Sequence, residues 1–329
     1  MKIARDCCIT LLILFSATLA YGHDAEPSAP QKAEPQITDT TAAFWTFWDS
    51  ASGKTDPEQA QLFFKLVVNK HPELYAPGIV NQVGFSGKQD DEVATKAVIN
   101  YLHGVTPYIP RMRVISATIA NDFQSYARDF MATFPRYAPT TEIYFTVSLF
   151  GFDGGTRRIN NKTALLFGID GIARFHQPDE SLKVFFDHEL FHQYHDQIAP
   201  ELTDDDAPIW MQLWEEGLAT YVSQRMNEGS SEAQVLMSAT LGSATQSILA
   251  RVAHEILVNA ESKDQREYAA FFFISNGRTD LPPRCGYYVG YKVAQQIGAG
   301  LTLQQLSELR GAALKGQVLA VLKQMADHP

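Results

Sequence analysis

Charge and cysteine are both scarce in this sequence, and the charge that is present is mostly negative. Charged residues make up 19% of the 329 positions, and the formal net charge is −10. Because a net negative chain repels phosphate backbones, we expect no nucleic-acid partner. Hydrophobic residues nevertheless reach 45%, an ordinary globular balance that argues against disorder, collagen and coiled coil for the chain as a whole.

The chain has three cysteines, Cys7, Cys8 and Cys285, and the first two lie in a segment typical of a secretory signal. Two positive charges precede an apolar run, and small residues around Ala20 offer a cleavage site. The run is too short for a confident membrane span, and an uncleaved N-terminal anchor is the alternative. We predict a signal peptide over 1–20 and a periplasmic or secreted protein with no stable membrane insertion after its removal. The mature chain would keep Cys285 as a buried thiol and have no internal disulfide.

The length exceeds the size at which one hydrophobic core usually keeps growing, so we expect one large domain or two joined lobes. Residues 21–40 are polar and contain prolines, which predicts a flexible leader. Residues 41–135 repeat apolar side chains at helical spacing and form the predicted helical region. In this region, Asp56–Gln59 combines a cap, a proline and a glutamine in the pattern of a helix start. Residues 136–329 are assigned to a catalytic region by the motifs below.

The apolar period changes near residue 140. Apolar and polar side chains alternate from Ile143 to Leu149, which predicts a half-buried strand. Asp153–Thr156 has the composition of a turn, and Ala164–Ile169 is a short apolar run suited to a second strand. We therefore expect a small antiparallel sheet. Everything after residue 180 is predicted to be helical, including a helix that starts with a capping box at Thr302–Gln305.

The most informative stretch is the His-Glu-x-x-His sequence from His188 to His192. On a helix the two histidines lie one turn apart on the same face, so both can reach one metal ion at about 2.0–2.1 Å. Glu189 stands beside the first histidine, where its carboxylate can take a proton from a water activated by the metal. Apolar neighbours indicate a buried helix, whose polar side chains a divalent cation would satisfy together. The alternative is a helix with two unrelated surface histidines.

A catalytic zinc ion takes three protein ligands and leaves one position open. A second helical stretch further along the chain carries Glu215 and Glu216, followed by Gly217 and small residues that would let this helix approach the first closely. Either carboxylate could be the third ligand. The acidic run Asp204–Asp206 is more typical of a solvated loop and helix cap than of a metal site.

His195 lies on the same helical stripe as the two motif histidines, one further turn on. It could be a third ligand. However, an ion held between His188 and His192 would lie too far back along the helix axis for easy reach. We therefore interpret His195 as a partner of a ligand or as helix-end packing.

These residues resemble the gluzincin zinc metallopeptidases, in which one helix carries His-Glu-x-x-His and a second carries Glu-Gly followed by small residues. His188–His192 and Glu216–Ala219 match the two pieces. The resemblance covers roughly residues 140–300 and extends to bacterial families known only as predicted zinc-dependent proteases. It implies Zn²⁺ bound by His188, His192 and Glu216, with Glu216 favoured over Glu215.

The resemblance also implies an α+β fold that is mostly helical, with a thermolysin-like zincin core, a small antiparallel sheet and an N-terminal helical region. In such a fold an edge strand, here expected at Ala164–Ile169, pairs with extended peptide substrate. The sequence departs from the pattern at Thr220, where some gluzincins carry an acidic residue that orients a histidine, so the partner of His188 is unassigned. The Gly-Ala-Met-Glu-Asn motif of the aminopeptidase N group is absent, which removes the main reason to predict an aminopeptidase.

Peptide hydrolysis passes through a tetrahedral oxyanion, which a tyrosine or histidine donor helps zinc to stabilise. A Tyr-x-x-Gly element at the start of a helix supplies that donor in some gluzincins, and Tyr287–Gly290 resembles it. Tyr287 is the first candidate and Tyr288 the second, and the alternative is an aromatic helix face packed in the core. Arg284, just upstream, has two interpretations: a ligand for a substrate carboxylate or a cation that faces solvent.

These observations predict a zinc-dependent peptidase that hydrolyses peptide bonds through metal-activated water, with Glu189 as base and Tyr287 as oxyanion donor. Its partners would be peptides or proteins as substrates. Two alternatives stay open: a catalytically silent zincin-fold module that binds peptides or proteins, and a zinc hydrolase of a non-peptide substrate. The sequence does not predict an oligomeric state.

Overall fold

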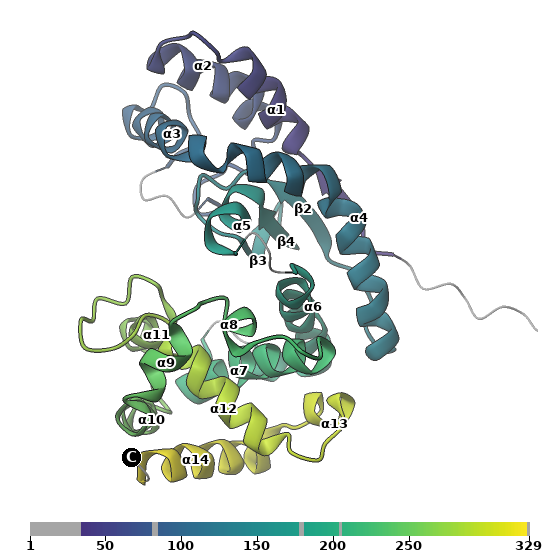
Figure 1. The fold of residues 1–329 in the computed structure, drawn as a ribbon, viewed down its shortest axis with the longest axis vertical. Coiled ribbons are helices and arrows are strands. Elements are labelled where there is room, and N and C mark those ends of the chain that lie inside the picture. The colour runs from purple at the N-terminus through teal and green to yellow at the C-terminus, as the bar shows by residue number, and fades with distance from the viewer. Residues whose placement is uncertain (1–33, 81–84, 178–180, 204–205, 328–329) are drawn as a thin grey trace, which may run out of the picture. The chain divides into compact units, whose positions relative to one another are not determined.

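Helices make up most of the chain, and a small sheet lies among them (Figure 1). The computed structural model describes residues 34–80, 85–177, 181–203 and 206–327. The predicted signal peptide and the first part of the predicted leader lie outside these residues. Within them, no helix combines the length and the apolarity needed to cross a lipid bilayer. The many helices and the small sheet together confirm a mostly helical α+β fold.

The described residues from 41 to 133 are helical wherever they form regular structure, as their apolar period predicts. They contain α1 (Thr41–Ser50), α2 (Asp56–Leu66), α3 (Glu92–Val105) and α4 (Ile109–Thr133), with short 3-10 helices at Val68–Lys70 and Thr106–Tyr108. The predicted cap of α2 is wrong by one residue. Thr55 is the cap, and its backbone N–H donates to the Glu58 carboxylate at 2.8 Å, so the capping box is Thr55 with Glu58.

The sheet has the strand order β1 (Ile37–Asp39), β2 (Glu142–Thr146), β4 (Lys162–Gly168) and β3 (Gly154–Ile159). β2 pairs in parallel with β1 and β4, and β3 pairs antiparallel with β4. The prediction of an antiparallel sheet is therefore wrong, because the sheet is mixed. The reason is the connection: the chain leaving β2 first forms β3 on the outer side of β4 and only then returns as β4.

Three smaller predictions about this region are also wrong. Asp153–Thr156 is not a turn, because β3 begins at Gly154, and the tight turn falls at Asn160 and Asn161, whose φ angles are 49° and 65°. The leader does not extend to residue 40, because Ile37–Asp39 forms β1. The strand expected at the edge, Ala164–Ile169, contributes β4, which is an inner strand.

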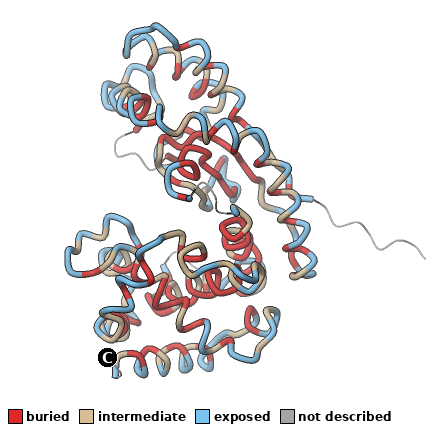
Figure 2. The backbone as a smooth tube through the Cα atoms, in the orientation of Figure 1, coloured by how far each residue is buried: buried red, intermediate tan, exposed pale blue. Residues whose placement is uncertain are grey.

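Aromatic side chains join the sheet to the helices on one face. Phe145 of β2 and Phe167 of β4 are cross-strand partners, and their ring centroids are 5.5 Å apart. Phe123 of α4 packs against both rings, and Phe186 of α6 (Lys183–Ile198) packs against Phe167 at 4.8 Å. Figure 2 shows that buried residues gather in the sheet and along α6. The N-terminal half of α6 is thus fixed to the sheet before the histidine motif is reached.

All described residues after β4 that form regular structure are helical, as predicted. Thr302 and Gln305 form the predicted capping box, with Gln305 N donating to Thr302 Oγ1 at 3.2 Å. Cys285 is buried and free, as predicted. Besides α6, these elements are α5 (Ile169–Phe175), a 3-10 helix at Pro200–Leu202, α7 (Ile209–Met226), α8 (Glu232–Val235), α9 (Leu241–Gln246), α10 (Leu249–Val258), α11 (Gln265–Phe272), α12 (Cys285–Ile297), α13 (Leu303–Ser307) and α14 (Gly311–Asp327).

Candidate metal centre

The two motif histidines face each other on α6. His188 and His192 lie one helical turn apart, and their Nε2 atoms are 3.0 Å apart. The His188 side chain is 3% exposed and the His192 side chain 16%. Phe185, Phe186 and Phe191 are buried on the same helix, so the expectation of a deeply buried motif helix is confirmed. Two unrelated surface histidines would not show this convergence.

Glu216 of α7 completes the cluster. Its Oε2 atom lies 3.4 Å from His188 Nε2 and 3.3 Å from His192 Nε2. These three side chains offer ligand atoms that all lie within 4.8 Å of one another. The Glu216 Oε2 atom is buried and has no hydrogen-bond partner among the described residues. Two imidazole nitrogens and one carboxylate oxygen, converging without other partners, match the donor set of a catalytic zinc site.

The carboxylate of Glu215, the residue before Glu216, lies on the side of the His192 ring opposite to Glu216. Glu215 Oε1 is 3.4 Å from His192 Nδ1, the ring nitrogen that faces away from the cluster. The two adjacent glutamates therefore approach opposite nitrogens of one imidazole. Thr220, which replaces an acidic residue of the gluzincin pattern, donates its hydroxyl to the Glu216 carbonyl at 2.8 Å and orients no histidine.

α7 is positioned by a close helix contact, but not the predicted one. We expected Gly217 to let α7 approach the histidine helix. Instead, a Cβ atom on Gly217 would overlap the backbone of Gly290 on α12. Near the start of α6, Asp187 accepts a hydrogen bond at 2.7 Å from Asn227, the residue that follows α7, and so joins the two helices. Lys183, also on α6, donates to the same carboxylate at 2.8 Å.

The charges of the cluster are strongly coupled. Burial would raise the pKa of Glu216, but the charge of His192 and the close approach of both imidazoles hold this pKa below its usual range. Burial would lower the pKa of His192, but the carboxylates of Glu216 and Glu215 raise it well above its usual value. Burial lowers the pKa of His188. An ionised Glu216 is the state that a metal ligand requires.

Glu189 lies beside the cluster with a free carboxylate. Among the described residues it makes no hydrogen bond and no ion pair within 4 Å. Burial raises its pKa to about 7, against the charge of His192 and with added repulsion from Asp153 and Glu216. A carboxylate with a pKa near neutrality and no structural partner can exchange protons during a reaction.

Tyr287 of α12 reaches the centre, and Tyr288 does not. The Tyr287 ring stacks on His188 with centroids 6.5 Å apart and an interplanar angle of 26°. Burial raises the Tyr287 pKa, and the charge of Glu216 raises it further, so the phenol keeps its proton. Tyr288 points elsewhere, because its hydroxyl donates to Gln246 at 2.6 Å.

The remaining candidates lie outside the cluster. His195 is fully buried, and its ring stacks on Phe191 with centroids 5.4 Å apart, which fits the packing interpretation. Neither of its ring nitrogens has a hydrogen-bond partner in the described part of the chain, and burial lowers its pKa to about 3. Asp204 and Asp205 of the acidic run lie outside the described residues.

Sequence reasoning missed several groups near Glu189. His176 and Asp153 form a pair, with His176 Nε2 3.0 Å from Asp153 Oδ2. Asp153 and Arg157 both act on the charge of Glu189 from the strand β3 side. Their positions depend on long-range pairing of β3 with β4, and no local spacing marks them.

One sequence family matches residues 85–311, a stretch that includes the whole cluster, and its description is "Putative zinc dependent peptidase (DUF5700)". The chain belongs to the DUF5700 family. Its cofactor is therefore Zn²⁺, and the family description implies peptides or proteins as substrates. No curated protein and no solved structure matches the chain. For this DUF5700 chain, the donor set of His188, His192 and Glu216 is chemically suited to the metal that the family description names.

Proposed function

We propose that the chain is a gluzincin-type zinc peptidase whose metal ligands are His188, His192 and Glu216. The observation that carries the proposal is the convergence of the two Nε2 atoms and the Glu216 Oε2 atom within 3.4 Å of one another. Zn²⁺ bound there would polarise the scissile carbonyl and make an attacking water more acidic. The order of sheet, histidine helix and glutamate helix also supports a thermolysin-like core as a proposal.

The chain's own residues would then carry the proton and the charge. Glu189 accepts the proton of the attacking water and passes it to the leaving amine, a role that its unpartnered carboxylate and its pKa of about 7 support. Tyr287 keeps its proton and donates a hydrogen bond to the developing oxyanion, which its stacking on His188 supports. Glu215 orients the His192 ring through Nδ1, whereas His188 Nδ1 has no hydrogen-bond partner among the described residues.

The substrate would bind as an added strand on β3. Among the described residues β3 pairs only with β4, so its other edge can accept hydrogen bonds from an extended peptide. Gln193 of α6 donates to Thr156 Oγ1 of β3 at 2.8 Å, which ties this strand to the histidine helix. Backbone pairing would align the peptide with the metal centre without reading its sequence. The N-terminal segment 1–20 supports export to the periplasm or the medium, also as a proposal.

The proposal is tested by zinc analysis together with digestion of a broad peptide library. We expect wild type to bind one zinc ion per chain and to cleave peptides. Glu189→Gln should keep the zinc and lose turnover, and Glu216→Ala should lose both. Glu228→Gln, at an exposed position after α7, is the matched control and should behave as wild type. Undiminished cleavage by Glu189→Gln would defeat the assigned base, and zinc binding without any cleavage would favour the silent binding module or a non-peptide substrate.

A further inference from the structure

Arg284 is a half-buried cation without a polar partner. Among the residues that the structure describes, its guanidinium makes no hydrogen bond and no ion pair. Arg278, in the same loop, has polar partners, because it donates to Asp280 at 2.7 Å and to Glu255 at 3.1 Å. A guanidinium has five N–H donors, and partly burying them without acceptors is unfavourable. Such a group is suited to a ligand that supplies the acceptors.

The position of Arg284 places this cation at the metal centre. Its Cζ atom lies 4.3 Å from the centroid of the Tyr287 ring, and the same ring stacks on His188. The guanidinium and a candidate zinc ligand therefore pack against the same aromatic ring. The charge also reaches across to β3: burial would raise the pKa of Asp153, but His176, and after it Arg284, lower this pKa below its usual value.

The backbone holds Arg284 in an uncommon conformation. Its φ and ψ angles are 62° and 22°, in the left-handed region that residues with a Cβ atom rarely adopt. Residues kept in this region tend to cluster at functional sites, where the surrounding structure compensates the strain.

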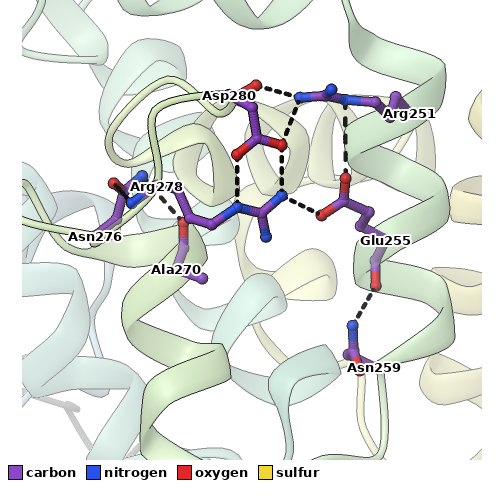
Figure 3. A network of polar contacts seen from close by, with 7 residues as sticks. All are labelled: Arg251, Glu255, Asn259, Ala270, Asn276, Arg278 and Asp280. Carbon is purple, nitrogen blue, oxygen red and sulfur yellow. Dashed lines mark hydrogen bonds and ion pairs between the residues drawn. The ribbon is translucent and has the colours of Figure 1, made fainter.

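Polar contacts fix the loop between α11 and α12, which precedes Arg284 (Figure 3). Asp280 accepts two hydrogen bonds from Arg278 and lies 3.4 Å from the Arg251 guanidinium of α10. Arg278 also contacts Glu255 of α10, and Asn276 donates to the Ala270 carbonyl of α11 at 3.2 Å. The loop is thus fixed to two helices, so the guanidinium of Arg284 is presented to the centre by a preorganised backbone.

We propose that Arg284 binds a carboxylate of the substrate, so that the enzyme prefers peptides with a carboxylate close to the bond it cleaves. The proposal rests on the proposed peptidase function. Arginine is suited to this task because its planar fork can donate two parallel hydrogen bonds to one carboxylate. The carboxylate can come from the peptide C-terminus or from an Asp or Glu side chain, and the experiment must separate these sources.

The experiment measures peptide capture without turnover, using zinc-loaded Glu189→Gln protein and mass spectrometry of the bound fraction. Two pools of the same randomised, N-acetylated hexapeptides are offered, one with C-terminal acids and one with C-terminal amides. We expect Glu189→Gln to enrich carboxylate-bearing peptides by about 10- to 100-fold, the range of a hydrogen bond to a charged group. Enrichment of acids over amides identifies the C-terminus, and enrichment of Asp and Glu over Asn and Gln within the amide pool identifies a side chain.

The same capture with Glu189→Gln/Arg284→Gln should lose the enrichment, and Arg284→Lys in that background should retain only part of it. Arg266→Gln is the matched control, because Arg266 is exposed and paired with Asp264, and it should leave the enrichment unchanged. Zinc content checks that each variant is folded.

Equal capture of all peptides by Glu189→Gln, or enrichment that survives Arg284→Gln, would overturn the proposal even if wild type cleaves peptides. Arg284-dependent enrichment without cleavage by wild type would instead support carboxylate binding and contradict the peptidase.

Discussion

Gly217 of α7 and Gly290 of α12 touch so closely that a Cβ atom on either residue would collide with the other helix. The residue before Gly217 is the candidate ligand Glu216, and Tyr287 lies one turn before Gly290. One glycine contact therefore helps to position both the proposed third ligand and the proposed oxyanion donor.

Gly217→Ala should destabilise the protein. The added methyl group would meet backbone atoms of Gly290 that cannot move aside, so α7 must shift, at a cost of about 1–3 kcal/mol in the free energy of unfolding. Zinc affinity should fall with it, because Glu216 moves too. Chemical denaturation measures the first effect and chelator competition the second. Gly316→Ala is the control: this exposed helical position in α14 has open space around it, and alanine should stabilise the protein by up to about 1 kcal/mol. Equal stability of Gly217→Ala and wild type would contradict the contact.

Substitutions of the two adjacent glutamates, Glu215 and Glu216, should weaken zinc binding to different extents. Glu215→Gln should weaken zinc binding by about 10- to 100-fold, the range for a group that orients a ligand. Glu216→Gln should weaken it much further, because a ligand is lost. Competition with a chelator of known affinity measures both variants. The reverse order would identify Glu215 as the ligand and remove Glu216 from the centre.

Tyr287→Phe should lower kcat by about 100- to 1,000-fold, the cost of removing one oxyanion donor, while zinc content and KM change little. Tyr288→Phe is the internal control, because its hydroxyl is committed to Gln246 and lies away from the centre. Steady-state kinetics on one library-selected peptide is sufficient. A larger loss for Tyr288→Phe would show that the assignment of the two tyrosines is inverted.

His195 should make the metal-free protein less stable in acid. Burial lowers its pKa to about 3, below the value of 6.5 expected for a histidine in the unfolded chain, and the charges of His192 and Arg310 act in the same direction. The unfolded state then binds more protons between these values. The free energy of unfolding should rise with pH from about 3 to 6.5, by at most about 1.4 kcal/mol per pH unit from this residue, and this contribution should be constant above that range.

His195→Phe, which keeps a ring against Phe191, should show a flatter pH dependence than wild type over that range. Urea unfolding at several pH values in the presence of a chelator compares the two proteins, since the other titrating groups are common to both. Identical slopes would mean that His195 is protonated in the folded protein.

The candidate site was more predictable from the sequence than the sheet. The spacing of His188 and His192 places both on one helical face whatever surrounds them, so local periodicity alone predicts their convergence. The choice between Glu215 and Glu216 depends on how α7 is rotated about its axis, which is set by distant contacts such as that with Gly290. The resemblance to gluzincins favoured Glu216, and the geometry places that carboxylate at both Nε2 atoms.

The sheet depends on pairing between distant segments, which local patterns do not reveal. β1 has only three residues in a polar context, and its partner β2 lies more than 100 positions further on. β3 contains Gly154 and Gly155, which favour a turn in isolation but here pack against Phe185 and Phe167 of the core and against Arg157. The position of Arg284 was equally inaccessible, because a left-handed arginine carries no sequence signal.

Zinc-edge anomalous diffraction from crystals of the zinc-loaded protein tests the central claim most directly. The account predicts one strong peak at about 2.0–2.2 Å from His188 Nε2, His192 Nε2 and a carboxylate oxygen of Glu216, with one position open toward Glu189. A peak that lies elsewhere, or that is coordinated by Glu215 with Glu216 turned away, would contradict it.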